Sequence, residues 1–90
     1  MKTIRIRVSG KVQGVFFRQG TQEIASALNI TGTVRNCEDD TVEIVATGSP
    51  GPLDQLVAWC WQGPPRARVI GVTTQELSLQ SFSHFSIIRH

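Results

Sequence analysis

The sequence predicts an α+β domain in which two helices cover one face of an antiparallel sheet. Segments with an apolar residue at every second position are typical of strands, and segments with one every three or four positions are typical of helices. In chain order the two patterns alternate as strand, helix, strand, strand, helix, strand, with a short fifth strand at the end. A chain of 90 residues is sufficient for one such domain, spanning residues 1–90.

The first strand and the first helix are predicted from their apolar patterns. Residues 4–8 alternate between apolar and polar side chains, which predicts a strand with one buried face. After a glycine-containing loop, a helical pattern runs from Arg18 to about Asn29, and Gly32 is expected to end that helix. The side chains predicted to share its inner face are Thr21, Ile24, Ala25 and Leu28.

A β-hairpin is predicted next, from residues 33–36 and 41–46, because the acidic segment 38–40 between them is typical of a turn. A second helix is expected to begin near Pro50 and to end before Gly63, which two prolines follow. Its predicted apolar stripe consists of Leu53, Leu56, Val57, Cys60 and Trp61, with Trp59 outside the stripe.

The last two strands complete the predicted topology. Residues 69–77 are expected to form the fourth strand, with Ile70 and Val72 in the core, and residues 82–89 a short strand at one edge. The resulting β-α-β-β-α-β order is that of a ferredoxin-like sandwich. Arg5 and Arg7 are expected on the open face of its sheet.

Composition and charge limit the classes of function. The net charge is +2, and the nine Lys and Arg residues are spread along the chain, which argues against nucleic acid as a partner. No apolar run is long enough to span a membrane, and the N-terminus does not resemble a secretory signal, so we expect a cytoplasmic protein. We expect a monomer because the domain is small. We expect Cys37 and Cys60 to be free thiols, with a disulfide as the alternative, and we expect no metal and no other cofactor.

The loop before the first helix points to chemistry. Gly10 and Gly14 allow positive φ angles and close backbone approach to a ligand, and free N–H groups at a helix N-terminus attract anions. Glycine spacing alone more often marks an ordinary turn. Arg18, however, opposes the helix dipole unless an anion lies nearby, which favours a phosphate site.

Two motifs resemble those of the acylphosphatase family. Its first signature, G-x-V-Q-G-V-x-F-R, matches Gly10-Lys11-Val12-Gln13-Gly14-Val15-Phe16-Phe17-Arg18 at every fixed position. Its second signature is similar to Gly32-Thr33-Val34-Arg35-Asn36, followed by Val42 and Gly48. The resemblance covers essentially the whole chain. It departs from the family pattern at Thr33, where an aromatic residue is usual, and at Asp40, where a glycine is usual.

The resemblance implies an enzyme that hydrolyses acyl phosphates to a carboxylate and inorganic phosphate. Arg18 would hold the phosphoryl group, and Asn36 would orient the attacking water. The loop residues implied to bind the substrate are Gln13, Gly14, Val15, Phe16 and Phe17. The alternatives are an RNA-binding module of the same topology and a module that binds phosphate-bearing ligands without turnover. The RNA alternative is weakened because Phe16 and Phe17 fall in a loop, whereas base-stacking aromatics belong on a central strand.

Overall fold

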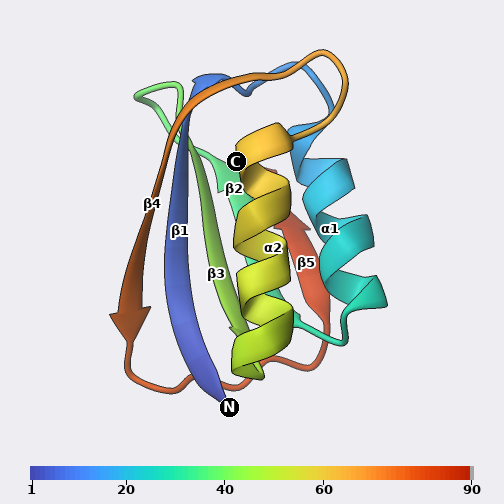
Figure 1. Ribbon diagram of the computed structural model, residues 1–90, viewed down its shortest axis with the longest axis vertical. Coiled ribbons are helices and arrows are strands. Elements are labelled where there is room, and N and C mark those ends of the chain that lie inside the picture. Colours follow the sequence, from blue (N-terminus) through green and yellow to red (C-terminus); the bar gives the residue numbers. More distant parts are fainter. Residues whose placement is uncertain (90) are drawn as a thin grey trace.

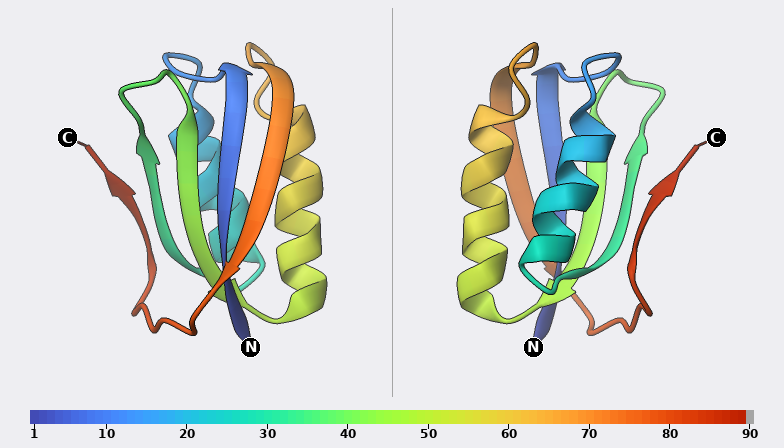
Figure 2. Two further views of the ribbon diagram at one scale, coloured as in Figure 1. Left: turned by 90° about the vertical axis from the view of Figure 1, so that its left-hand side faces the viewer. Right: turned by 90° about the vertical axis from the view of Figure 1, so that its right-hand side faces the viewer.

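One five-stranded sheet and two helices make up the computed structural model, which describes residues 1–89. Both helices cover the same face of the sheet, and the opposite face is open (Figures 1 and 2). The predicted βαββαβ order with a fifth strand is therefore confirmed. The elements are β1 (Lys2–Lys11), α1 (Phe17–Ala27), β2 (Thr31–Asn36), β3 (Val42–Gly48), α2 (Pro50–Gln62), β4 (Arg68–Leu77) and β5 (Phe85–Ile88).

The sheet is mixed rather than wholly antiparallel. Its strand order is β4-β1-β3-β2-β5, and every neighbouring pair is antiparallel except β2 and β5, which run parallel. The reason lies in the connection between the last two strands. After β4 the chain crosses to the opposite edge along the lower end of the sheet, and β5 then runs upward beside β2 (Figure 1).

The core lies between the sheet and the two helices. The alternation predicted for the first strand is confirmed, because Ile4, Ile6 and Val8 are all buried. Full burial of one such side chain contributes about 1.5–3 kcal/mol to folding. Both cysteines are free thiols, as expected; Cys60 belongs to the core, and burial raises the pKa of its thiol to about 12.

The first helix ends earlier than predicted, and Gly32 does not end it. The helix stops at Ala27, and Asn29 takes the left-handed conformation with φ 57°. Gly32 lies within β2 with φ 148°, where an added Cβ would clash with the carbonyl oxygen of Val45. Glycine is therefore needed at this position for the close approach of β2 and β3.

The two tryptophans of α2 exchange their predicted environments. Trp61 is 54% exposed, whereas Trp59 packs against the core and its ring centroid lies 5.3 Å from that of Phe17. The reason is the position of the neighbouring helix. An added Cβ on Gly20 would lie 2.9 Å from the Trp59 ring, so α1 approaches α2 closely on the side that bears Trp59.

Ile70 is not part of the core and is 78% exposed. In the pairing of β1 with β4, Ser9 lies opposite Gly71 and Gly10 lies opposite Val69, so Ile70 is the extra residue of a bulge. A bulge reverses which side chains face the core. Val69 and Val72 are accordingly the β4 residues that pack against the hydrophobic core.

Candidate active site

The loop between β1 and α1, residues 12–16, is held by buried side chains on both sides of an exposed tip. Val12 and Val15 are buried within it, whereas Phe16 is 69% exposed. Phe16 has φ 67°, which is uncommon for a bulky side chain and costs about 1–3 kcal/mol. Gly14 has φ 73°, and an added Cβ there would meet no atom of residues 1–89 within 4 Å. The loop is thus firmly anchored, with open space above Gly14.

The main chain of this loop offers unused donors. Within residues 1–89, no N–H group of residues 13–19 donates a hydrogen bond to the protein. The first helical bond of α1 runs from the N–H of Gly20 to the carbonyl oxygen of Phe16 at 3.0 Å. Phe16 provides no side-chain cap, and the first turn of α1 contains no acidic residue. This helix N-terminus therefore favours a bound anion.

A pocket of about 290 Å³ opens beside this helix end. It brings together five of the residues predicted for the site, from segments that are distant in the sequence: Gly14, Phe16, Phe17, Arg18 and Asn36. Val15 does not line the pocket; its side chain is buried in the core, as is the side chain of Phe17. The remaining lining residues are Val12, Gln19 and Arg89.

Arg18 supplies positive charge to the pocket. It is half-buried in the first turn of α1. In the described part of the chain it forms no ion pair and no side-chain hydrogen bond. The guanidinium is therefore free to form charge-assisted hydrogen bonds with an anion in the pocket.

Asn36 stands at the end of β2 and lines the same pocket. Its Oδ1 atom is buried, and no hydrogen-bond partner for this atom exists among residues 1–89. A buried acceptor without a partner is destabilising unless water or a ligand satisfies it. The pocket therefore suits a polar molecule that can donate a hydrogen bond to Asn36.

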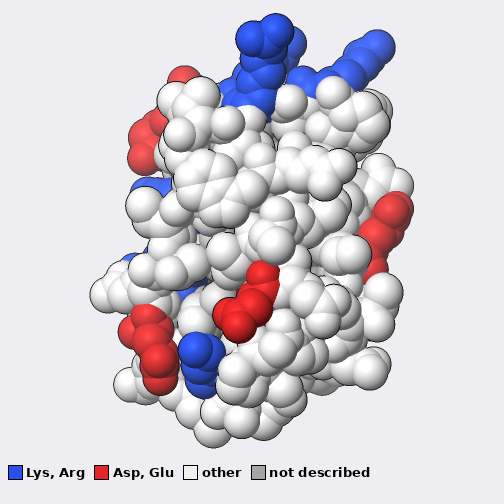
Figure 3. All heavy atoms as spheres, viewed as in Figure 1, with Lys and Arg blue, Asp and Glu red and all other residues white. Residues whose placement is uncertain are grey.

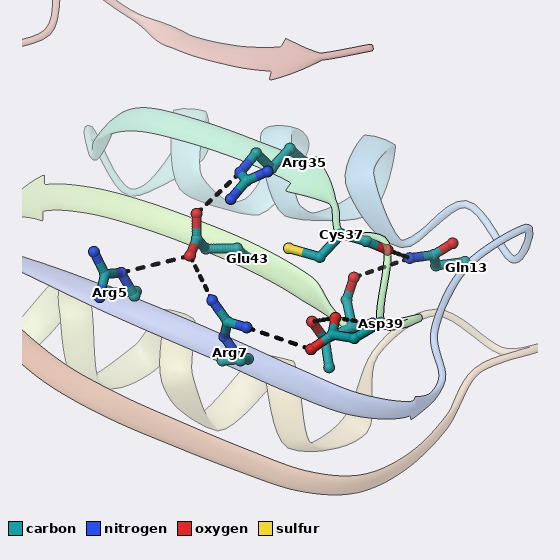
Figure 4. Close-up of polar contacts among 8 residues, drawn as sticks. Arg5, Arg7, Gln13, Arg35, Cys37, Asp39 and Glu43 are labelled. Atoms are coloured by element: carbon teal, nitrogen blue, oxygen red, sulfur yellow. Dashed lines mark hydrogen bonds and ion pairs between the residues drawn. The ribbon is translucent and has the colours of Figure 1, made fainter. Parts of the chain in front are cut away.

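Gln13 links the loop to the hairpin instead of lining the pocket with its side chain (Figure 4). Its Nε2 atom donates to the carbonyl oxygens of Cys37, at 2.8 Å, and Thr41, at 3.0 Å. The hairpin turn between those two residues is closed by a bond from the N–H of Cys37 to Thr41 at 2.8 Å. Gln13 thus fixes the loop relative to Asn36, the residue that precedes Cys37.

Gln13→Ala is expected to lower both stability and activity. The change removes two hydrogen bonds, which corresponds to about 1–2 kcal/mol of stability. It also frees the loop to move relative to Asn36, so we expect about a tenfold loss in kcat/KM because precise positioning contributes to the rate. Urea unfolding and steady-state kinetics measure the two effects. A stability loss with unchanged kcat/KM would show that the link does not position the site.

Arg89 lines the pocket but was not predicted from the sequence. The parallel pairing of β2 and β5 places Arg35 opposite Ile88, so the next residues, Asn36 and Arg89, come to the same end of the sheet. The sequence contains no local signal for this proximity, because it depends on the direction in which β5 runs.

The turn between β2 and β3 is confirmed at residues 37–41. Asp40 has φ 71°, so an aspartate occupies a left-handed position in this turn, which aspartate tolerates better than most residues. The Asp39 carboxylate accepts hydrogen bonds from the hydroxyl and the N–H of Thr41, at 2.6 and 3.2 Å. The hydrogen bond from the Thr41 hydroxyl is the main cause of the lowered pKa of Asp39.

An ion cluster occupies the open face of the sheet next to the site (Figure 4). The Glu43 carboxylate lies 2.8 Å from Arg7, 3.0 Å from Arg35 and 3.5 Å from Arg5, and its side chain is only 12% exposed. Burial alone would raise the pKa of Glu43, but the hydrogen bonds and charges of Arg35 and Arg7 outweigh it and lower the pKa. Charged residues thus occupy this face where an RNA-binding sheet presents aromatic side chains.

Glu43→Gln is expected to reduce stability by about 1–2 kcal/mol at pH 7. The folded-state pKa of Glu43 is lowered from its ordinary value of 4.5, so its contribution is complete above about pH 4.5 and is lost as the pH falls through the folded-state value. Urea unfolding of both proteins at pH 7 and pH 3 tests this expectation. The difference in the free energy of unfolding between the two proteins should be smaller at pH 3 than at pH 7. An equal difference at both pH values would exclude the ionised carboxylate as its cause.

Residues 1–89 contain no group of three or more His, Cys, Asp or Glu side chains placed to hold a metal ion. None of the helices in this range is long and apolar enough to span a membrane.

Comparison with known proteins identifies the family. The family model for acylphosphatase matches residues 4–87. An acylphosphatase of Methylococcus capsulatus is 43% identical over 90 residues, which cover 99% of this chain and 98% of the relative. One of Rubrobacter xylanophilus is 53% identical over 75 residues, covering 83% and 68% of the two chains.

Solved structures agree with these relatives. The crystal structure of an acylphosphatase from Bacillus subtilis is 37% identical and superposes with a TM-score of 0.95, covering 99% of this chain and 100% of that one. The structure of an acylphosphatase from Coxiella burnetii is 40% identical with a TM-score of 0.94, covering 97% and 92%. The chain therefore belongs to the acylphosphatase family and is a hydrolase that acts on acid anhydrides.

Proposed function

We propose that this chain hydrolyses acyl phosphates by direct attack of water on the phosphorus atom, without a covalent intermediate. The proposal depends on one observation, namely which groups line a single pocket. The buried and unpartnered Oδ1 atom of Asn36 shares that pocket with Arg18 and with a helix N-terminus whose N–H groups have no partner in residues 1–89.

The loop and Arg18 bind the phosphoryl group. Its oxygens accept hydrogen bonds from the main-chain N–H groups of residues 13–18, and the positive end of the α1 dipole reinforces them. The planar guanidinium of Arg18 adds two parallel donors. These groups stabilise the charge that spreads over the phosphoryl oxygens in the transition state, which is the main requirement of phosphoryl transfer.

Asn36 orients the attacking water, which donates a hydrogen bond to its Oδ1 atom. The water oxygen forms a bond to phosphorus while the bond between phosphorus and the carboxyl oxygen breaks. That bonding pair leaves with the carboxylate, and the water proton passes to solvent. A carboxylic acid has a pKa of about 4, so its anion departs at neutral pH without a proton donor. The reaction therefore requires no general acid for the leaving group.

The test is hydrolysis of benzoyl phosphate by the purified protein in water enriched in ¹⁸O. We expect multiple turnovers, with one ¹⁸O atom in each phosphate and none in the benzoate. Label in the benzoate would mean attack at the carbonyl carbon and would contradict the mechanism. A burst of benzoate that precedes phosphate release would reveal a phosphorylated enzyme and would exclude direct attack by water. If the folded protein fails to hydrolyse benzoyl phosphate, the proposed activity is wrong.

A further inference from the structure

Arg89 provides a second positive charge at the pocket, and the proposed mechanism does not use it. It lies directly after β5, lines the pocket and is exposed. No ion pair or side-chain hydrogen bond of Arg89 is present in the part of the chain that the structure describes. A long cationic side chain of this kind can reach an anionic group of a bound ligand.

The sheet order places Arg89 and the phosphate-binding loop on opposite sides of Asn36. The loop starts from β1, Asn36 ends β2, and Arg89 follows β5 at the outer edge, in the strand order β1-β3-β2-β5. Figure 2 shows the same arrangement, with the end of β5 beyond β2 and away from the loop. A ligand whose phosphoryl group is bound by the loop therefore has Arg89 on the side opposite the loop, beyond Asn36.

The charges of the pocket support separate roles for its two arginines. Arg18 stands at the helix N-terminus together with the unused N–H groups, so the donors for the phosphoryl oxygens are gathered there. None of the pocket-lining residues within the described range 1–89 is acidic, so none of them neutralises Arg89. Arg89 is thus available for a different anionic group of the substrate.

We infer that Arg89 determines substrate specificity by binding an anionic group in the acyl part of the substrate. The preferred class would be acyl phosphates whose acyl chain carries a carboxylate or a second phosphate. This inference rests on the proposed function, because it assumes that the loop and Arg18 bind the phosphoryl group.

The experiment compares two rigid substrates of nearly the same size and shape, 4-carboxybenzoyl phosphate, with an anionic distal group, and 4-carbamoylbenzoyl phosphate, with a neutral one. We expect the unmodified protein to prefer the carboxylate substrate by about three- to tenfold in kcat/KM, a range suited to an exposed charge pair. Arg89→Gln should abolish that preference through a higher KM for the carboxylate substrate and should leave the carbamoyl substrate within twofold. Arg89→Glu should reverse the preference.

Arg66→Gln is the matched control. Arg66 is exposed in the connection between α2 and β4, at the end of the molecule from which Lys and Arg side chains project (Figures 1 and 3). It does not line the pocket. The Arg66→Gln change should alter kcat/KM by the same factor for both substrates. That factor gives the contribution of the overall charge of the protein.

Two results would overturn the inference while leaving the proposed function intact. Equal losses on both substrates in Arg89→Gln would mean that Arg89 acts on the common phosphoryl group. An unchanged preference in that variant would mean that Arg89 does not bind the substrate. Failure of the unmodified protein to hydrolyse either substrate would instead refute the proposed function itself, and the inference with it.

Discussion

Arg18→Gln is expected to lower kcat/KM for benzoyl phosphate by about a hundred- to a thousandfold, because removing one preorganised donor from a developing charge has an effect of this size. Glutamine keeps much of the side-chain length but lacks the charge and the fork of donors. Arg18→Lys should recover only part of the rate, since an ammonium group retains the charge without the planar geometry. Steady-state kinetics on benzoyl phosphate measure these effects.

The fold should be unaffected by the same change. Arg18 forms no ion pair or side-chain hydrogen bond within residues 1–89, so the free energy of unfolding should stay within about 0.5 kcal/mol. The stabilisation that inorganic phosphate gives to the folded protein should decrease, because the anion loses its charged partner. Arg66→Gln again serves as the control and should retain normal kinetics. An Arg18→Gln variant with kcat/KM within threefold of normal would remove Arg18 from the mechanism.

Asn36→Ala is expected to lower kcat by about a hundred- to a thousandfold with little change in KM. The side chain is proposed to orient the water, and that interaction contributes in the transition state rather than in substrate binding. Asn36→Asp should be at least as damaging, because a carboxylate at this position repels the phosphoryl group. Separate determination of kcat and KM with benzoyl phosphate distinguishes this role from phosphate binding.

Stability provides a second readout for Asn36. Its Oδ1 atom is buried and has no partner within residues 1–89, so its removal sacrifices no hydrogen bond of the described structure. We expect Asn36→Ala to unfold at the same or a higher urea concentration than the unmodified protein. Cys37→Ala, at the adjacent position, is the control and should leave kcat nearly unchanged. A parallel loss of stability and activity in Asn36→Ala would indicate a structural role instead.

Local patterns in the sequence determined most of the fold. The alternation at Ile4, Ile6 and Val8 was correct because a strand places every second side chain on one face, and this property depends only on the strand itself. The helix stop at Gly63 was correct for the same kind of reason, since two prolines follow it. The errors occurred where a neighbouring element decides the outcome. Trp59 is packed because α1 lies beside it, and Ile70 is exposed because of a bulge against β1.

In the candidate site, too, some features follow from local sequence and others depend on neighbouring elements. The glycine loop and Arg18 could be predicted from one contiguous segment, because the loop conformation and the helix N-terminus are local properties. The sequence also indicated Asn36, through the resemblance of its motif, and the structure places it in the same pocket. Only the tertiary structure showed that the side chain of Gln13 binds the hairpin and that Arg89 reaches the pocket. Both contacts join residues that are distant along the chain, and pairing between distant strands is decided by the packing of the whole sheet rather than by local sequence.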